Sequence, residues 1–129
     1  YLKTVLESVN ADYKWQIVGH LSYPVRYATY ENRELLYDEH REIIDEILKT
    51  IIRRDKYLEI NTSTKDERAF SPEIGIIKRY IDLGGENFTY GSDSHDLSRY
   101  REKCDKVAEL LASFGKTTSF FREMRPVAE

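Results

Sequence analysis

Tyr57-Leu58-Glu59-Ile60 is a short apolar run typical of a buried strand, and the segments on either side of it indicate helices. Before it, residues 32–53 place apolar side chains at the i, i+3, i+4 spacing of an amphipathic helix. After it, Ser71 is expected to cap a second helix, with Pro72 at the first helical position and a glycine pair ending it after Leu83. A strand enclosed by two helices is the repeating unit of α/β folds.

The same alternation continues in both directions. Outside this central unit the sequence predicts a helix over 1–9, strands over 15–19, 87–90 and 117–121, and a helix over 97–114 that Gly115 ends. Strands that alternate with helices pair in parallel through right-handed crossovers. A closed (β/α) barrel needs about 250 residues. Residues 1–129 are therefore expected to form about half of one barrel domain.

Composition narrows the class of protein. Apolar residues make up 40% of the chain and charged residues 33%, which indicates an ordinary globular domain. The net charge of −3 argues against a general nucleic-acid binder, which would carry a basic face. The sequence has no apolar run of membrane-spanning length and no signal-peptide pattern. Cys104 is the single cysteine and lacks an internal disulfide partner, so we expect a cytoplasmic protein.

Chemically capable side chains follow three of the predicted strands. His20 follows the first, Asn61 the second, and Asp93 and His95 the third. In parallel α/β folds the active site lies at the carboxyl ends of the strands. In an extended segment, residues two apart point to the same side, so Asp93 and His95 can aim at one point. Imidazole nitrogen and carboxylate oxygen together suit zinc, manganese or iron.

Simpler interpretations stay open for these residues. His20 alone could be a structural, hydrogen-bonded group. The Ser-Asp-Ser-His segment could be capping chemistry, with Ser94 or Asp96 as the N-cap of the following helix. His40 lies among charged residues and is expected to be solvated surface. Cys104 is expected to be inert, since no second cysteine or adjacent histidine accompanies it.

Four segments carry a resemblance to a known family: Gly19-His20-Leu21, Leu58-Glu59-Ile60-Asn61-Thr62-Ser63, Leu83-Gly84-Gly85-Glu86 and Gly91-Ser92-Asp93-Ser94-His95. They resemble the later motifs of the PHP (polymerase and histidinol phosphatase) family, and are closest to its histidinol-phosphate phosphatases. The resemblance implies a distorted seven-stranded (β/α) TIM-like barrel that holds a trinuclear cluster of zinc, manganese or iron. It implies that His20, Asp93 and His95 are metal ligands, with Asp93 and His95 also catalytic.

The resemblance also implies a reaction and a missing partner. The reaction is hydrolysis of a phosphate monoester, with L-histidinol phosphate of histidine biosynthesis as the expected substrate. The family's N-terminal His-x-His motif and its middle His and Glu ligands are absent, and nothing in Tyr1–Tyr13 can replace them. We therefore expect the chain to be the C-terminal half of the barrel, inactive alone and completed by the N-terminal half.

Three residues are candidates for binding the substrate. Arg26 lies six residues beyond His20, and its guanidinium can hold two phosphate oxygens at once. Arg68 is a shifted equivalent of the arginine that follows the family's Asn-Thr-Ser motif. Asn61 could meet the substrate from the end of the second strand.

A different class of protein remains possible. The PHP family includes domains attached to DNA polymerases, some without activity, so the chain could be a metal-binding or interaction module. The net negative charge argues against a direct role in binding DNA. An upstream His-x-His segment would decide for an enzyme, and its absence for a module.

Overall fold

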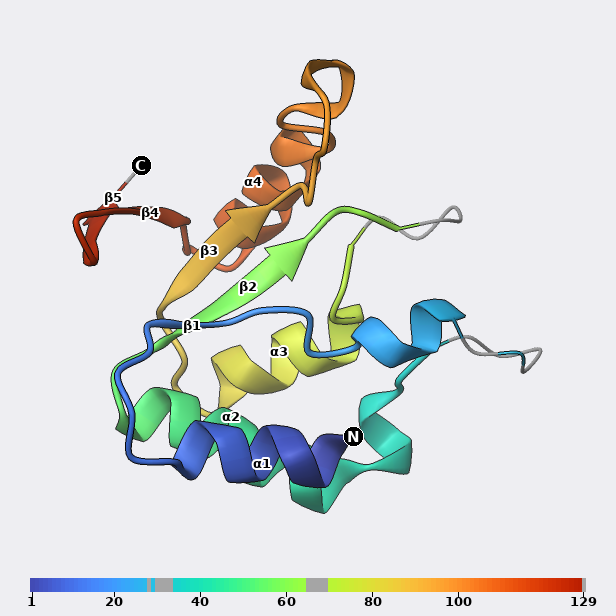
Figure 1. Cartoon of the computed structure of the whole chain (residues 1–129), viewed down its shortest axis with the longest axis vertical. Helices are drawn as coiled ribbons and strands as arrows, with labels where there is room; N and C mark the ends of the chain where they lie inside the picture. Colours follow the sequence, from blue (N-terminus) through green and yellow to red (C-terminus); the bar gives the residue numbers. More distant parts are fainter. Residues whose placement is uncertain (28, 30–33, 65–69, 129) are drawn as a thin grey trace.

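A computed structural model describes residues 1–27, 29, 34–64 and 70–128 of the chain. A parallel sheet has the order β1 (Ile17–Val18), β2 (Tyr57–Asn61) and β3 (Phe88–Gly91). The helices α1 (Leu2–Asn10), α2 (Arg41–Arg53) and α3 (Ile74–Asp82) lie together on one side of this sheet, and α4 (Cys104–Ser113) lies beside β3 (Figure 1). This arrangement confirms the predicted α/β class with parallel pairing.

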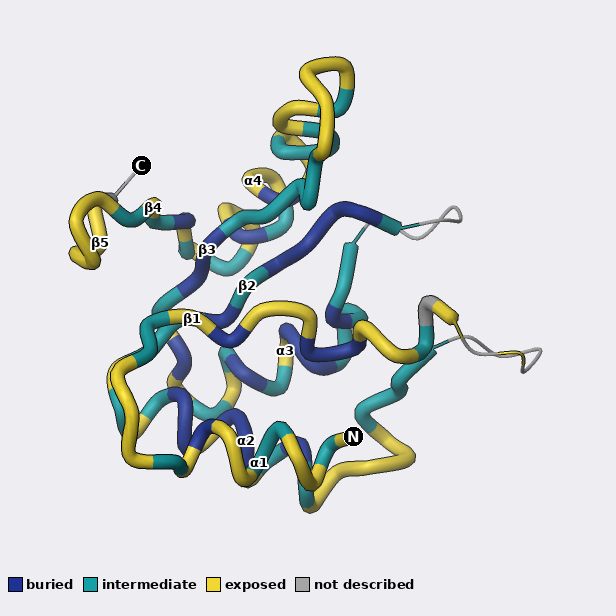
Figure 2. The backbone as a smooth tube through the Cα atoms, in the orientation of Figure 1, coloured by how far each residue is buried: buried dark blue, intermediate teal, exposed yellow. Residues whose placement is uncertain are grey.

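The core lies between the sheet and these helices. Leu58 and Ile60 alternate along β2 and are fully buried. The same is true of one face each of α2 and α3, made up of Ile44, Ile47, Leu48, Ile51, Ile76 and Ile77. Figure 2 shows the buried stretches of sheet and helices facing each other. The ring of Tyr80 meets that of Phe88 edge to face, with centroids 5.1 Å apart, a separation typical of aromatic pairs. Burial of this apolar surface is the main source of stability in a small domain. Within the described residues, no helix has the length and apolar character to cross a membrane.

The helix expected over 32–53 begins later than the sequence predicted. Leu36 has an extended backbone, the 3-10 helix η2 (Tyr37–Glu39) follows, and α2 starts only at Arg41. The Tyr37 N–H donates to the carboxylate of Glu73 at 3.1 Å, which holds this entry segment against α3. Residues 32 and 33 lie outside the described part of the chain.

The predicted start of the next helix was also wrong. Ser71 pairs with the end of β2, donating to and accepting from the Asn61 backbone at 2.8 Å each, and its bond to Pro72 is cis. The N-cap of α3 is Glu73, whose side chain accepts the Gly75 N–H at 2.6 Å. The tertiary pairing of Ser71 overrides its local capping preference.

The helix expected over 97–114 is interrupted. A short 3-10 helix, η3 (Leu97–Arg99), comes first, and α4 begins at Cys104. Between them Arg101 and Lys103 have φ values of 61° and 56°, which a continuous right-handed helix cannot contain. The predicted end is confirmed, because Gly115 has a φ of 67° and donates its N–H to the Ala112 carbonyl.

The last predicted strand does not extend the parallel sheet. Its counterpart β4 (Ser119–Arg122) pairs with β5 (Arg125–Ala128) as an antiparallel hairpin beside the main body (Figure 1). A single bridge between Thr118 and Phe88 joins this region to β3. β5 was not predicted, because Pro126 and the charged residues around it lack the apolar pattern of a strand.

Candidate metal and substrate site

The three strands end at the same edge of the sheet. The register pairs Val18 with Leu58, Leu58 with Phe88, and Asn61 with Gly91. His20 and the segment 92–95 therefore follow the carboxyl ends of β1 and β3, and Asn61 is the last residue of β2 between them, at the edge that the sequence predicted. Figure 1 shows the parallel strands β2 and β3 side by side. This is the edge at which open α/β sheets bind their ligands.

His20 is held in an unusual backbone conformation. Its φ is 56°, in the left-handed region that few residues other than glycine adopt. Its N–H donates to the Glu59 carboxylate at 3.0 Å, and its carbonyl accepts from the Tyr1 hydroxyl at 2.6 Å. The exposed imidazole lies against the ring of Tyr23, with centroids 4.8 Å apart. Glu59 and Tyr1 thus hold the backbone of His20, and Tyr23 contacts its ring.

No role for Glu59 was predicted from the sequence. It lies on the opposite face of β2 from Leu58 and Ile60, and its carboxylate fills the space beside Gly19 and Gly91 on the neighbouring strands. A Cβ on Gly19 would stand 3.0 Å from the Glu59 Oε2, and a Cβ on Gly91 would be closer still to Oε1. The sequence did contain a signal for this role. A glutamate lies within a predicted strand, and a glycine directly precedes each of His20 and Ser92 at the ends of the two neighbouring strands.

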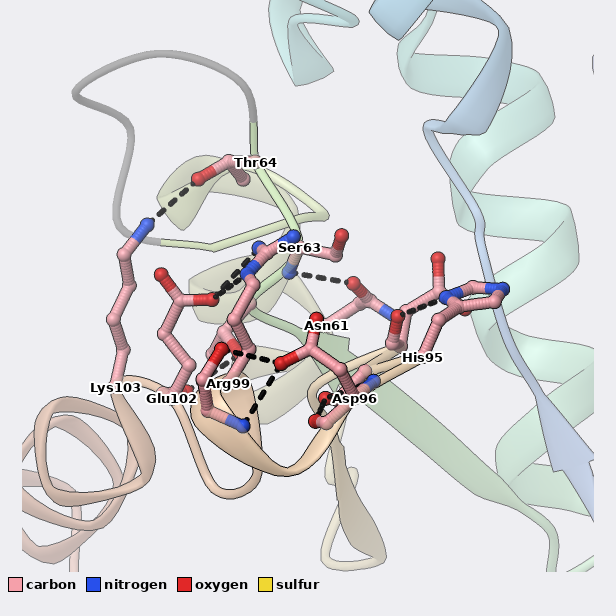
Figure 3. A network of polar contacts seen from close by, with 12 residues as sticks. Asn61, Ser63, Thr64, His95, Asp96, Arg99, Glu102 and Lys103 are labelled. Atoms are coloured by element: carbon pink, nitrogen blue, oxygen red, sulfur yellow. Dashed lines mark hydrogen bonds and ion pairs between the residues drawn. The ribbon is translucent and has the colours of Figure 1, made fainter.

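Asp93 and His95 form a compact turn after β3. Asp93 has a φ of 50°, and the Nδ1 of His95 lies 2.9 Å from the Asp93 carbonyl oxygen (Figure 3). Such a contact favours a proton on Nδ1 and leaves the Nε2 lone pair available, which is how metal-bound histidines are oriented. The prediction that Asp96 is an N-cap is confirmed as well. Its side chain accepts the Ser98 N–H at 2.8 Å and caps η3.

This turn is tied back to the end of β2. The Glu102 carbonyl accepts from the Thr62 hydroxyl at 2.7 Å and from the Tyr90 hydroxyl at 2.8 Å. Burial raises the pKa of Tyr90, so the hydroxyl stays a donor. Lys103 donates to the Thr64 side chain at 2.9 Å (Figure 3). These contacts hold the segment after β3 against the segment after β2.

The predicted metal ligands have suitable chemistry but do not make a complete site. Imidazole nitrogen and carboxylate oxygen are the donors that zinc and related ions prefer. Among the described residues, however, no three His, Cys, Asp or Glu side chains gather closely enough to hold an ion by themselves. The role of His20, Asp93 and His95 as ligands stays a prediction, and any such site needs further donors.

The predicted substrate-binding residues differ in how far the structure describes them. Asn61 is buried, with 5% of its surface exposed, and its Oδ1 accepts the Ser63 N–H at 2.9 Å. The backbone of Arg26 belongs to the 3-10 helix η1 (Tyr23–Tyr27), while its side chain lies outside the described atoms. Arg68 lies outside the described residues.

Comparisons with known proteins agree with this geometry. The PHP domain family model matches residues 1–63. A probable histidinol-phosphatase of Clostridium acetobutylicum is 38% identical over 74% of this chain and 38% of its own length. The histidinol-phosphatase of Lactococcus lactis is 34% identical over 89% of this chain and 43% of its own length.

A solved structure of a histidinol phosphate phosphatase is also similar to this chain. The crystal structure of histidinol phosphate phosphatase from Lactococcus lactis, complexed with zinc, L-histidinol and phosphate, superposes with a TM-score of 0.79 and 27% identity. The match covers 98% of this chain and 49% of that protein. The chain thus spans about half the length of the relatives that it matches.

The parallel strands and the polar strand ends agree with these matches, and over residues 1–63 the chain is similar to PHP domain proteins. The relatives that it matches are named histidinol-phosphatases or probable histidinol-phosphatases.

Proposed function

We propose that the protein containing this chain is a cytoplasmic, metal-dependent phosphatase of histidine biosynthesis that hydrolyses L-histidinol phosphate. One observation carries the proposal: His20, Asn61 and the Asp93–His95 turn lie at the carboxyl ends of three adjacent parallel strands, at one edge of the sheet. The related Lactococcus protein, crystallised with zinc, L-histidinol and phosphate, supports this choice of substrate.

Residues 1–129 would be the C-terminal part of a single seven-stranded barrel. In this proposal His20, Asp93 and His95 contribute to a trinuclear cluster of zinc, manganese or iron, and the N-terminal half supplies the other ligands. The shortage of donors among the described residues supports a shared site. The described part of β1 has only β2 as a sheet partner, so the other edge of β1 is a place where further strands can add.

The residues of this chain would have different roles at the site. Bound divalent ions supply positive charge for the phosphoryl oxygens and lower the pKa of water. The Asp93 carboxylate offsets that positive charge, and the Nδ1 contact of His95 keeps its Nε2 directed outward for coordination. Arg26 and Arg68 would bind phosphate oxygens, and Asn61 would contact the substrate.

The test is a phosphatase assay on the intact protein, meaning this chain together with the other half of the barrel. We expect metal-dependent release of phosphate from L-histidinol phosphate, lost on chelation and restored by zinc or manganese. The isolated 129-residue chain should bind metal weakly and show no appreciable turnover.

Two results would contradict the proposal. Full activity of the isolated chain would show that the metal site is complete without the other half. Tight metal binding by the intact protein without hydrolysis of any phosphate monoester would favour a binding or interaction module.

A further inference from the structure

A cavity opens beside His20, and none of the residues 92–95 is among those that line it. Its lining includes Ser22, Val25, Leu35, Asn61 and Phe70. Val25, Leu35 and Phe70 make much of this lining apolar, as in pockets that hold the organic part of a small molecule. The predicted ligand His20 lines the same cavity, so a molecule bound there would reach the proposed metal site.

Two polar side chains of this cavity are buried and lack a hydrogen-bond partner among the described residues. Asn61 is 5% exposed and Ser22 is 6% exposed, and neither the Asn61 Nδ2 nor the Ser22 Oγ makes a hydrogen bond. Buried polar groups in native proteins are nearly always paired, so each such group requires an explanation.

The orientation of Asn61 is fixed by its other contacts. Its Oδ1 accepts the Ser63 N–H, and its backbone pairs with Ser71 in both directions. The amide nitrogen therefore stands on the remaining side, where a Cβ on Gly91 would lie 3.4 Å from it. The side chain thus offers N–H donors without a partner from a fixed support at the end of β2.

We propose that Ser22 and Asn61 recognise the imidazole ring of the substrate. A neutral imidazole has one nitrogen that accepts a hydrogen bond and one that donates. Asn61 would donate to the first, and the Ser22 hydroxyl would accept from the second. The apolar side chains around them would contact the ring carbons. This inference rests on the proposed function, since it concerns the part of L-histidinol phosphate that is not hydrolysed.

The experiment compares two substrates in the intact metal-loaded protein. L-Phenylalaninol phosphate keeps the amine and the phosphate ester but replaces imidazole by a phenyl ring without nitrogen. A site that hydrogen-bonds a substrate group discriminates strongly against an analogue without it. We expect kcat/KM to favour L-histidinol phosphate by at least about 100-fold in the parent.

Ser22→Ala is the decisive variant, because it removes an atom without a hydrogen-bond partner in the described structure and should leave the fold intact. We expect it to lower the substrate preference by about 10-fold or more. Inhibition by L-histidinol should weaken to a similar degree, while inhibition by inorganic phosphate should not change. Asn61→Asp, which keeps Oδ1, should lower the same preference. Ser113→Ala, on the exposed end of α4, is the matched control and should behave as the parent.

The outcomes separate this inference from the proposed function. A preference that stays within about threefold of the parent in Ser22→Ala, a shift below roughly 0.7 kcal/mol, would overturn imidazole recognition by this pair while leaving the phosphatase activity established. If the parent hydrolyses neither ester, the proposed function fails and the inference fails with it.

Discussion

The Glu59 carboxylate accepts a hydrogen bond from the backbone N–H of His20 at 3.0 Å. Glu59 lies in the middle of β2, and its side chain reaches the segment that follows the neighbouring strand β1. His20 has a φ of 56°, which is costly for a residue with a Cβ and persists only when surrounding contacts enforce it. The hydrogen bond to Glu59 is one of the contacts that enforce this φ. It also sets the direction in which the chain leaves β1 at His20.

Removing this contact should weaken the fold. We expect Glu59→Ala to lower the free energy of unfolding by about 1.5–3 kcal/mol, because hydrogen bonds to charged groups contribute in this range. Glu59→Gln keeps an acceptor at the same place and should lose less. Urea unfolding monitored by circular dichroism measures both. Glu109→Ala, an exposed site on α4, is the control; equal stability of Glu59→Ala and this control would show that the contact contributes nothing.

Gly91 and Glu59 should be energetically coupled. A Cβ on Gly91 would meet the Glu59 carboxylate, so Gly91→Ala must move that carboxylate away from the His20 N–H. We therefore expect Gly91→Ala to destabilise the parent, and to cost less in a Glu59→Ala background. A double-mutant cycle should give a coupling of about 0.5–3 kcal/mol. Strictly additive effects would refute this contact as the reason for glycine at position 91.

The pairing of Asp45 with Arg79 should make stability depend on pH. Arg79 donates to the two carboxylate oxygens at 2.9 and 2.6 Å, and the Tyr37 hydroxyl adds a third bond at 3.0 Å. The hydrogen bonds from Arg79 hold the pKa of Asp45 below its ordinary value. A lowered native pKa means that the unfolded state binds the proton first as pH falls, so this contribution is present at neutral pH and lost in acid.

We expect the free energy of unfolding of the parent to fall as pH is lowered from about 4, the ordinary pKa of an aspartate, toward about 2. Asp45→Asn should be less stable at neutral pH and should show a shallower loss over the same range. Glu46→Gln, at the neighbouring exposed position, is the control and should keep the slope of the parent. Parallel pH profiles for Asp45→Asn and the parent would contradict the linkage.

The elements that the sequence predicted well are those with a strong local pattern. The strand 57–60, the helix over 1–9 and the glycine end at Gly115 were found within a residue or two, because their apolar spacing and chain-ending glycines act locally. The prediction that Ser71 caps α3 was wrong, because Ser71 pairs with Asn61 at the end of β2 and local sequence does not indicate that pairing. The break before α4 was missed because nothing in the types of Arg101 and Lys103 marks a positive φ.

The candidate site was predicted in the same uneven way. The position of His20, Asn61 and Asp93 at one edge follows from parallel pairing alone, and the register confirms it. The role of Glu59 was not foreseen, since it depends on the space left by glycines on two neighbouring strands. Whether the three proposed ligands share a metal stays a prediction, since no three His, Cys, Asp or Glu side chains gather among the described residues.

Asp93 is the residue on which the metal hypothesis can be tested most directly. Asp93→Asn keeps the size of the side chain but removes the charge that would offset bound cations. In the intact protein we expect metal content to fall and kcat to drop by at least about 100-fold, more than the loss typical of an altered outer-shell partner. The thermal unfolding of the metal-free variant should match that of the metal-free parent.

Asp96→Asn separates metal binding from helix capping. Asp96 lies three residues further on and caps η3 by accepting the Ser98 N–H. An asparagine can still cap a helix, so this variant should keep its metal, its turnover and its stability. Metal analysis by plasma mass spectrometry and a phosphate-release assay on both variants give the comparison. If Asp93→Asn retains the metal and turnover of Asp96→Asn, then Asp93 is not a ligand, and the conformation of the Asp93–His95 turn serves the fold alone.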